Sequence, residues 1–360
     1  MKSSTISGLA DFEAERARWS ELYRADPSGR GFLSWEWLRA ALPVVRQKWQ
    51  IVVVREGETL VAALPLATRP IPSRALPIAS ELSFATDPIA DYQGMLCLPG
   101  REREAARAFA AAIRRMRWDR AAFGDVADDR FDLVLAELRG GTDATVTGET
   151  TCLWTALPAD WESFSRALGR TTRQHTAQKL RKLTAIDGFR STVASDADFA
   201  VHLEALLSLN HKRWGGNRNR QRAKYGRLFT EAHRTGALRL LGLWRDEQPI
   251  AACASFVDPV RGTYGFYQSG FEPAFAALSP GNVMVAVAIR DAIEHGYRVF
   301  DFLRGDEPYK RAFADQVTVT RHHRVRRRSV RASVFDAVQP TYHTLKLAAA
   351  RVVYGPGRTV

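Results

Sequence analysis

The sequence is poor in cysteine and has no long apolar run. Cys97, Cys152 and Cys253 stand far apart among 360 residues. An odd number of cysteines at such spacings forms neither a disulfide framework nor a paired zinc-ligand motif, so we expect reduced, mostly buried thiols. The N-terminus turns acidic before an apolar stretch develops, and no run approaches the 18 or so apolar residues that a membrane span needs. We therefore expect a cytoplasmic protein.

Three common catalytic signatures are also missing. The sequence contains no GxxxxGK[ST] phosphate loop, no GxSxG nucleophile elbow and no HExxH motif. Nucleotide hydrolysis, α/β-hydrolase chemistry and zinc proteolysis therefore lack their usual residues. His322 and His323 are adjacent on an expected strand, so their side chains face opposite ways, which is poor geometry for a shared metal ion. We expect no metal site.

The sequence is rich in positive charge and in hydrophobic residues that can form a core. Lys and Arg number 52 against 39 Asp and Glu, giving a formal net charge of +13 and an isoelectric point near 10.0, and 46% of the residues are hydrophobic. Such a charge attracts anionic partners, whether nucleotide phosphates, RNA or an anionic membrane surface. The length favours two domains of ordinary size.

The expected helices and strands follow a similar order in the two halves of the chain. The first half predicts helices at 11–27, 32–42, 101–117 and 131–140, a hairpin at 49–57 with 58–70, and strands at 90–98 and 119–126. A basic amphipathic helix at 169–188 follows and ends at a glycine.

The second half predicts the order β-α-α-β-β-β-α-β-α-β-β. The expected strands are 189–195, 237–246, 249–259, 262–271, 297–305, 318–327 and 329–338, and the expected helices are 196–215, 224–236, 281–296 and 307–314. A last helix is expected at 340–355.

This order resembles the GNAT acyltransferase superfamily. The stretch SPGNVM, followed some twenty residues later by FDFLRGDEPYKRAFA, resembles the CelD/BcsL-like branch of cellulose and exopolysaccharide biosynthesis, which is similar to the tandem-domain Fem aminoacyltransferases. The resemblance implies an α/β fold with mixed sheets and tandem GNAT-like lobes, the second better preserved. The expected parts are a degenerate lobe at 1–168, a linking helix at 169–187, a catalytic lobe at 188–338, and a C-terminal helix and tail at 339–360.

The resemblance also implies a place for the donor. In GNAT folds the fourth and fifth strands diverge, and the donor lies between them with its phosphates at the start of the following helix; here those strands are 262–271 and 297–305. A helix start suits phosphate because of its free N–H groups and dipole. The expected donor-binding residues are Tyr267, Gln268, Ser279, Gly281, Asn282 and Arg304.

Two features leave the donor open. The usual coenzyme A signature has Arg or Gln, two residues, Gly, one residue, then Gly or Ala. Aligned on Gly281, this chain has Leu278 and Val283 at the outer positions, so donors other than acyl-CoA remain possible. Ser279 and Pro280 are also consistent with an ordinary capped helix.

Asp301, Tyr309 and Lys310 are the expected catalytic residues. Strand alternation places Asp301 in an apolar setting, which suits a proton acceptor for an attacking ammonium group. Tyr309 would protonate a leaving thiolate and Lys310 would stabilise negative charge. The alternative is structural: Asp301 bonds its own loop and Lys310 lies on a solvated face.

The basic helix and the segment after it supply candidate substrate-binding residues, Arg173 and Trp214. They suit phosphates and a stacked base, although a solvated basic face and a core tryptophan at a helix end are the commoner explanations of such residues. The predicted function is acyl transfer to an amine of a small molecule or of a polysaccharide or cell-envelope precursor, with acyl-CoA as co-substrate. The alternatives are Fem-like transfer from aminoacyl-tRNA and a non-catalytic binding protein of the same fold.

Overall fold

The protein is described by a computed structural model that covers residues 1–72, 77–214 and 218–338, with side chains at 72, 77, 78, 213, 214 and 218–220 left out. It confirms a mixed α/β fold. The N-terminal lobe contains β1 (Lys2–Ile6), α1 (Leu9–Ala14), α2 (Arg16–Ala25), α3 (Trp35–Ala41), β2 (Lys48–Glu56), β3 (Thr59–Pro72), β4 (Pro77–Phe84), β5 (Leu96–Cys97), α4 (Glu102–Arg115), β6 (Arg120–Val126) and α5 (Phe131–Leu138).

The C-terminal lobe repeats this plan. After β7 (Thr142–Ala156) the chain forms α6 (Trp161–Ala167), α7 (Arg170–Thr184), β8 (Phe189–Val193), α8 (Phe199–Trp214), α9 (Arg218–Arg234), β9 (Leu238–Arg245), β10 (Gln248–Asp258), β11 (Thr263–Phe271), α10 (Pro280–Glu294), β12 (Val299–Arg304), α11 (Pro308–Arg311) and β13 (Gln316–Arg327). In each lobe a helix separates two parallel strands: α4 lies between β4 and β6, and α10 between β11 and β12.

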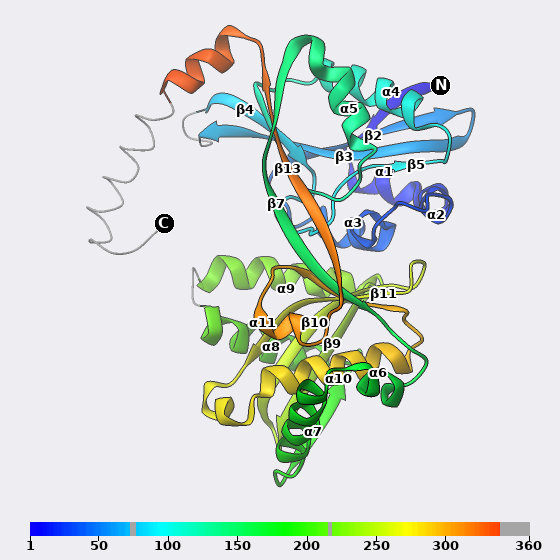
Figure 1. The fold of residues 1–360 in the computed structure, drawn as a ribbon. Coiled ribbons are helices and arrows are strands. Elements are labelled where there is room, and N and C mark those ends of the chain that lie inside the picture. Colours follow the sequence, from blue (N-terminus) through cyan, green and yellow to red (C-terminus); the bar gives the residue numbers. More distant parts are fainter. Residues whose placement is uncertain (73–76, 215–217, 339–360) are drawn as a thin grey trace.

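Two long strands join the lobes into one sheet. The described strands follow the order β1-β2-β3-β4-β6-β13-β7-β12-β11-β10-β9-β8, and β5 pairs with β3. β7 and β13 run antiparallel over the full length of β13, from Trp154 opposite Gln316 to Thr142 opposite Arg327. β13 also pairs with β6 of the N-terminal lobe, whereas β7 pairs with β12 of the C-terminal lobe. Figure 1 shows this ribbon crossing from one lobe to the other.

Three apolar clusters form the core. One lies between the sheet and α4 with α5, and another lies between the sheet and α10. The third spans the lobe interface: Trp37 of α3 packs edge-on against Phe256 of β10 with ring centroids 4.4 Å apart, and Phe229 of α9 belongs to the same cluster. Because the interface is a shared apolar core, the two lobes are held as one packed unit.

Sequence reasoning missed three strands and misassigned one segment. β1, β4 and β7 were not predicted, because their residues show little apolar alternation; most of β7 between 143 and 149 is exposed. Residues 330–338 form a helix and not the expected strand. The Ser329 hydroxyl accepts a hydrogen bond from the Ala332 N–H at 3.2 Å, and the buried Ala332 and Phe335 are three positions apart, as on one helix face.

Two other sequence expectations concern domain organisation. The basic helix α7 packs against α10 of the C-terminal lobe. The expected last helix at 340–355 lies outside the described residues. The proposed domain boundaries stay predictions.

Candidate active site between the lobes

The site begins where two parallel strands part. β11 and β12 are paired only from Thr263 opposite Val299 to Gly265 opposite Asp301, although both strands continue further. Just beyond this point the register of β11 against β10 shifts, so that Tyr267 is an extra residue in β11. A bulge of this kind bends a strand and interrupts its pairing. The sheet therefore opens at Gly265 and Asp301.

Asp301 is buried at this opening, with 6% of its surface exposed. Its Oδ1 accepts a hydrogen bond of 2.7 Å from the Leu303 N–H. Burial raises the pKa of the carboxyl to about 6. The nearby charge of Asp91 also raises this pKa, whereas the Leu303 N–H, Tyr92 and Arg30 lower it. A carboxyl with this pKa is charged at pH 7 and only weakly solvated, as a general base requires.

The strand that carries Asp301 ends in an unusual backbone turn. Leu303 has φ of +59° and Gly305 has φ of +107°. Left-handed backbone at a leucine is unfavourable and persists only where surrounding contacts enforce it. Here the Leu303 N–H is held by the Asp301 carboxyl, so the base and the turn fix one another.

Arg304 fastens this turn to the N-terminal lobe. Its Nε lies 2.8 Å from Asp91 and its Nη1 lies 3.0 Å from Asp125, and its Nη2 donates to the Pro88 carbonyl at 2.8 Å. Burial raises the pKa of Asp91 while Arg304 lowers it. The Arg304 guanidinium therefore joins the two lobes. That it also binds the donor stays a prediction.

A cavity of about 530 Å³ lies between the lobes and reaches the opening. Gly265, Asp301 and Leu303 line it from the C-terminal lobe, and Arg30, Trp37 and Tyr92 line it from the N-terminal lobe. The Arg30 guanidinium lies 5.6 Å from the centre of the Tyr92 ring. The Tyr92 hydroxyl is buried beside Asp301 and Cys152, without a hydrogen bond of ordinary geometry to a described residue, and is near enough to Asp301 to lower the pKa of that carboxyl.

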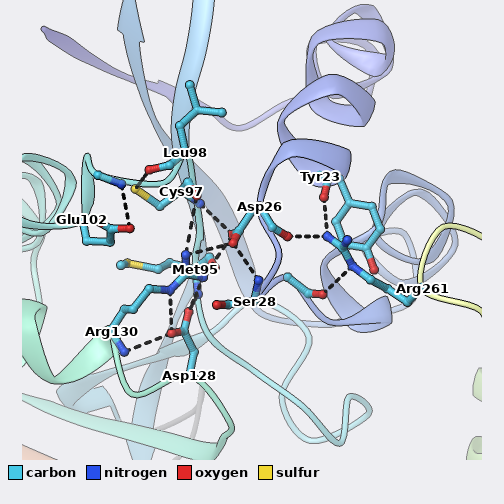
Figure 2. A network of polar contacts seen from close by, with 12 residues as sticks. Tyr23, Asp26, Ser28, Met95, Cys97, Leu98, Glu102, Asp128, Arg130 and Arg261 are labelled. Carbon is cyan, nitrogen blue, oxygen red and sulfur yellow. Dashed lines mark hydrogen bonds and ion pairs between the residues drawn. The ribbon is translucent and has the colours of Figure 1, made fainter. Parts of the chain in front are cut away.

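Two arginines hold the N-terminal wall of the cavity in place (Figure 2). Arg130 forms an ion pair with Asp26 at 2.9 Å and with Asp128 at 2.8 Å. Arg261, at the end of β10, donates to the carbonyls of Gly29, Tyr23 and Asp26. Because the chain from 26 to 31 is tied from both lobes, the position of Arg30 above Tyr92 is defined by the fold.

The other two predicted catalytic residues lie beyond the turn. Lys310 is 3% exposed; its Nζ donates to the Arg304 carbonyl at 2.6 Å and lies 2.9 Å from Glu307. Lys310 therefore links the short helix α11 to the end of β12, and it does not lie on a solvated face. Tyr309 is half-buried and packs on the cluster beneath α10. Neither residue lines the cavity, and their catalytic roles stay predictions.

The predicted donor residues are spread over two places. Ser279 is the N-cap of α10, with φ of +52°, but its side chain makes no capping hydrogen bond. A side chain at Gly281 would meet the Phe271 ring at an ordinary 3.6 Å, so close packing does not require glycine there. Asn282 lies in the first turn of the same helix, and none of these three residues lines the cavity.

Tyr267 and Gln268 lie in the diverging part of β11. The Tyr267 hydroxyl donates to the Ile89 carbonyl at 2.9 Å, within the apolar cluster shared by the lobes. The Oε1 of Gln268 is buried without a hydrogen-bond partner among the described residues. Tyr267 thus serves the lobe interface in this structure, whereas Gln268 keeps an unused acceptor.

The two predicted substrate-binding residues lie elsewhere. Nη1 of Arg173 on α7 donates to the Arg166 carbonyl at 3.1 Å. Trp214 ends α8, and its side chain lies outside the described residues. Sequence reasoning missed Arg30, Trp37 and Tyr92, because they come from the first lobe and no local motif marks residues that meet the site only through folding.

The opening between parallel strands, the following helix and the paired lobes define an acyl-transfer type of fold. Residues 170–311 match the family described as acetyltransferase (GNAT) domain. The matched region runs from α7 to α11 and lies within the C-terminal lobe. No curated protein sequence matches the chain.

Solved structures show the same fold over nearly the whole chain. FemX has 11% identity and a TM-score of 0.65, covering 94% of this chain and 100% of its own. The C-terminal domain of a putative lysylphosphatidylglycerol synthetase from Agrobacterium fabrum has 13% identity and a TM-score of 0.57, covering 98% and 99%. A tandem GNAT protein from the clavulanic acid biosynthesis pathway has 12% identity and a TM-score of 0.51, covering 91% and 98%.

The predicted tandem GNAT-like fold is confirmed by these matches. The domain match together with the GNAT folds supports an N-acyltransferase. Among the described residues there is no group of three His, Cys, Asp or Glu side chains placed to bind a metal ion. No helix in the described part of the chain has the length and hydropathy to cross a bilayer.

Proposed function

We propose that the protein transfers an acyl group from an activated donor, most simply acyl-CoA, to an amine bound in the cavity between the lobes. The observation that carries the proposal is the position of Asp301: a buried carboxyl with a pKa of about 6, at the point where β11 and β12 part and facing the cavity. Both reactants would be held together, which removes much of the entropic barrier of a bimolecular reaction.

The proposed reaction is direct attack in a ternary complex. Asp301 accepts a proton from the acceptor ammonium, and the amine nitrogen attacks the thioester carbonyl carbon. A C–N bond forms, the C–S bond breaks, and the leaving thiolate takes a proton from Tyr309, whose phenolate then receives the second proton that the attacking nitrogen loses. Tyr309 suits this role because it packs on the α10 face of the sheet, where the donor is proposed to lie. Lys310 and Arg304 hold the turn that orients Asp301.

The donor is proposed to approach from α10. Ser279 gives the first turn of this helix no side-chain cap, but its carbonyl accepts the N–H groups of Asn282 and Val283, and Pro280 has none. The start of α10 therefore offers a phosphate the Gly281 N–H and the helix dipole. Gln268 adds an unused acceptor in the diverging strand, suited to an amide N–H of the donor arm. Donor and acceptor would then meet at Asp301 from opposite faces of the sheet.

The acceptor class is proposed from the cavity and the resemblance together. Aromatic rings of Trp37, Tyr92 and Trp154 and the carboxylate of Asp301 line the cavity. This combination suits an amine on an amphipathic body such as an amino sugar, because flat rings cover apolar faces and a carboxylate attracts ammonium. An amine of a polysaccharide or cell-envelope precursor, as in the CelD/BcsL-like branch, fits this description.

A Fem-like reaction with aminoacyl-tRNA is the second candidate. It is favoured by α7, on which Arg170, Arg181 and Lys182 are exposed cations with no ion pair to a described residue. Such a helix suits a nucleic-acid backbone, and binding to it would weaken steeply with salt.

Native mass spectrometry distinguishes the donors. The protein is incubated with an acyl-CoA mixture and, separately, with aminoacylated tRNA at two salt concentrations. Retention of one acyl-CoA, with loss of its acyl group when amino sugars are added, supports the proposal. Retention of tRNA alone, lost at higher salt, supports the second candidate. If neither donor is retained and Asp301→Asn behaves as the wild type in every assay, a non-catalytic binding protein is favoured.

A further inference from the structure

A second cavity of about 410 Å³ lies in the N-terminal lobe, at the end of α4 and against the edge strand β1. Residues of β1, β2 and β3 form its floor, and residues 112 and 115–117 form its wall. None of its lining residues belongs to the cavity that contains Asp301. We call this second cavity the edge groove.

The floor of the edge groove is a polar continuation of an apolar sheet face. Along β2, Val54 and Val52 are fully buried beneath α4, and Gln50 and Lys48 follow at the same two-residue spacing. On β3, Leu66 is likewise buried and Thr68 follows, opposite Lys48. The sheet thus extends past the end of α4, and its side chains turn polar where the cover stops.

Three cations border this floor without an ion-pair partner among the described residues. Lys48, Arg115 and Arg117 are exposed, and none makes an ion pair or a side-chain hydrogen bond to another described residue. No Asp or Glu lines the groove. Three like charges around one concavity repel each other, which a bound anion would relieve.

The arginines are not needed to cap the helix. Arg327 of β13 already donates to the carbonyls of Arg114 and Met116 at the end of α4, at 2.7 Å and 3.4 Å, and stacks on Trp118. This guanidinium meets the usual demand of a helix C-terminus for positive charge. Arg115 and Arg117 are therefore not required as caps of α4, and their side chains are available to a ligand in the edge groove.

We propose that the edge groove binds a pyrophosphate group of a small molecule. Lys48 would act as a point charge on one phosphate, the two arginines would donate charge-assisted hydrogen bonds, and the hydroxyls of Ser3, Thr5 and Thr68 would bond the remaining oxygens. The groove has room for a diphosphate with an attached sugar, because cavities of this volume hold small ligands. This inference is independent of the acyl-transfer proposal.

The test is calorimetric titration of the full chain with inorganic pyrophosphate in Mg²⁺-free buffer of low ionic strength. The variant Lys48→Gln/Arg115→Gln/Arg117→Gln removes the three cations. The variant Arg24→Gln/Arg103→Gln/Arg139→Gln removes the same charge from exposed positions of the same lobe, outside the groove. Thermal melting checks that both variants fold.

The expected result is saturable binding that weakens at least about tenfold in the groove variant and less than about twofold in the control, because only the former loses direct contacts. Equal weakening in both variants would show a diffuse charge effect and overturn the proposal. A parallel arm uses vesicles of phosphatidylglycerol against phosphatidylcholine. Groove-dependent binding to the anionic vesicles without binding of pyrophosphate would replace the small molecule by a lipid surface, and so also overturn it.

Discussion

At the scale of single residues, Asp301 carries the proposed chemistry. Replacing it by Asn removes the proton acceptor but keeps an oxygen for the Leu303 N–H. We expect Asp301→Asn to lower the rate of acyl transfer by about 10² to 10⁴, the usual contribution of a general base. The measurement is thiol release from acetyl-CoA with a panel of amino sugars as acceptors. Asp315→Asn, an exposed carboxyl soon after the turn, is the matched control and should keep the wild-type rate.

The substitution Asp301→Asn, which is expected to lower activity, is also expected to raise the stability of the fold above pH 6. The pKa of Asp301 is raised from 3.8 to about 6, so the folded state holds this proton more tightly than the unfolded chain. Burial of the group therefore carries little charge penalty below pH 4, destabilises the fold increasingly as pH rises from about 4 to 6, and adds no further penalty above that. We expect Asp301→Asn to be more stable than the wild type at pH 8, by up to roughly 3 kcal/mol in urea unfolding, and to have similar stability at pH 3. Equal destabilisation at both pH values would mark the carboxyl as a structural group.

At the scale of elements, the turn after β12 depends on Arg304. Its partners Asp91 and Asp125 are buried, with side chains 6% and 4% exposed, while Arg304 itself is 38% exposed. We expect Arg304→Gln to destabilise the protein by about 2 kcal/mol in urea unfolding, less than for a fully buried pair because water screens the guanidinium. Arg311→Gln breaks the exposed pair with Asp306 and should change stability by less than about 0.5 kcal/mol. Equal effects of the two substitutions would contradict the proposed clamp.

The elements also show what the sequence can and cannot predict. The apolar periods of α10, β11 and β12 are local, and each of these elements was predicted close to its observed bounds. The burial of Asp301 followed from strand alternation alone. By contrast, the contacts of Arg304 and the cavity wall at Arg30 and Tyr92 join residues about 200 positions apart, and nothing in either segment encodes its partner.

At the scale of the whole molecule, β7 and β13 make the lobes inseparable. The matched family region at 170–311 ends before β13 and begins after β7, yet β7 supplies the neighbour of β12, the strand that carries Asp301. A fragment that begins at 170 lacks β7. The two strands that flank β7 in the sheet, β12 and β13, then have unpaired backbone groups. Exposed strand edges of this length favour aggregation.

Two fragments of the C-terminal lobe test this dependence. The fragment 170–338 lacks β7, whereas 142–338 keeps it and restores its pairing with both β12 and β13. Because β7 also contributes Cys152 and Leu153 to the core clusters, we expect 142–338 to be the more soluble fragment and to show the sharper thermal transition. Both fragments still lack β6 and the N-terminal half of the shared apolar core, so neither should match the melting temperature of the full chain. Equal solubility and cooperativity of the two fragments would mean that β12 is stable without β7, which contradicts the proposed dependence.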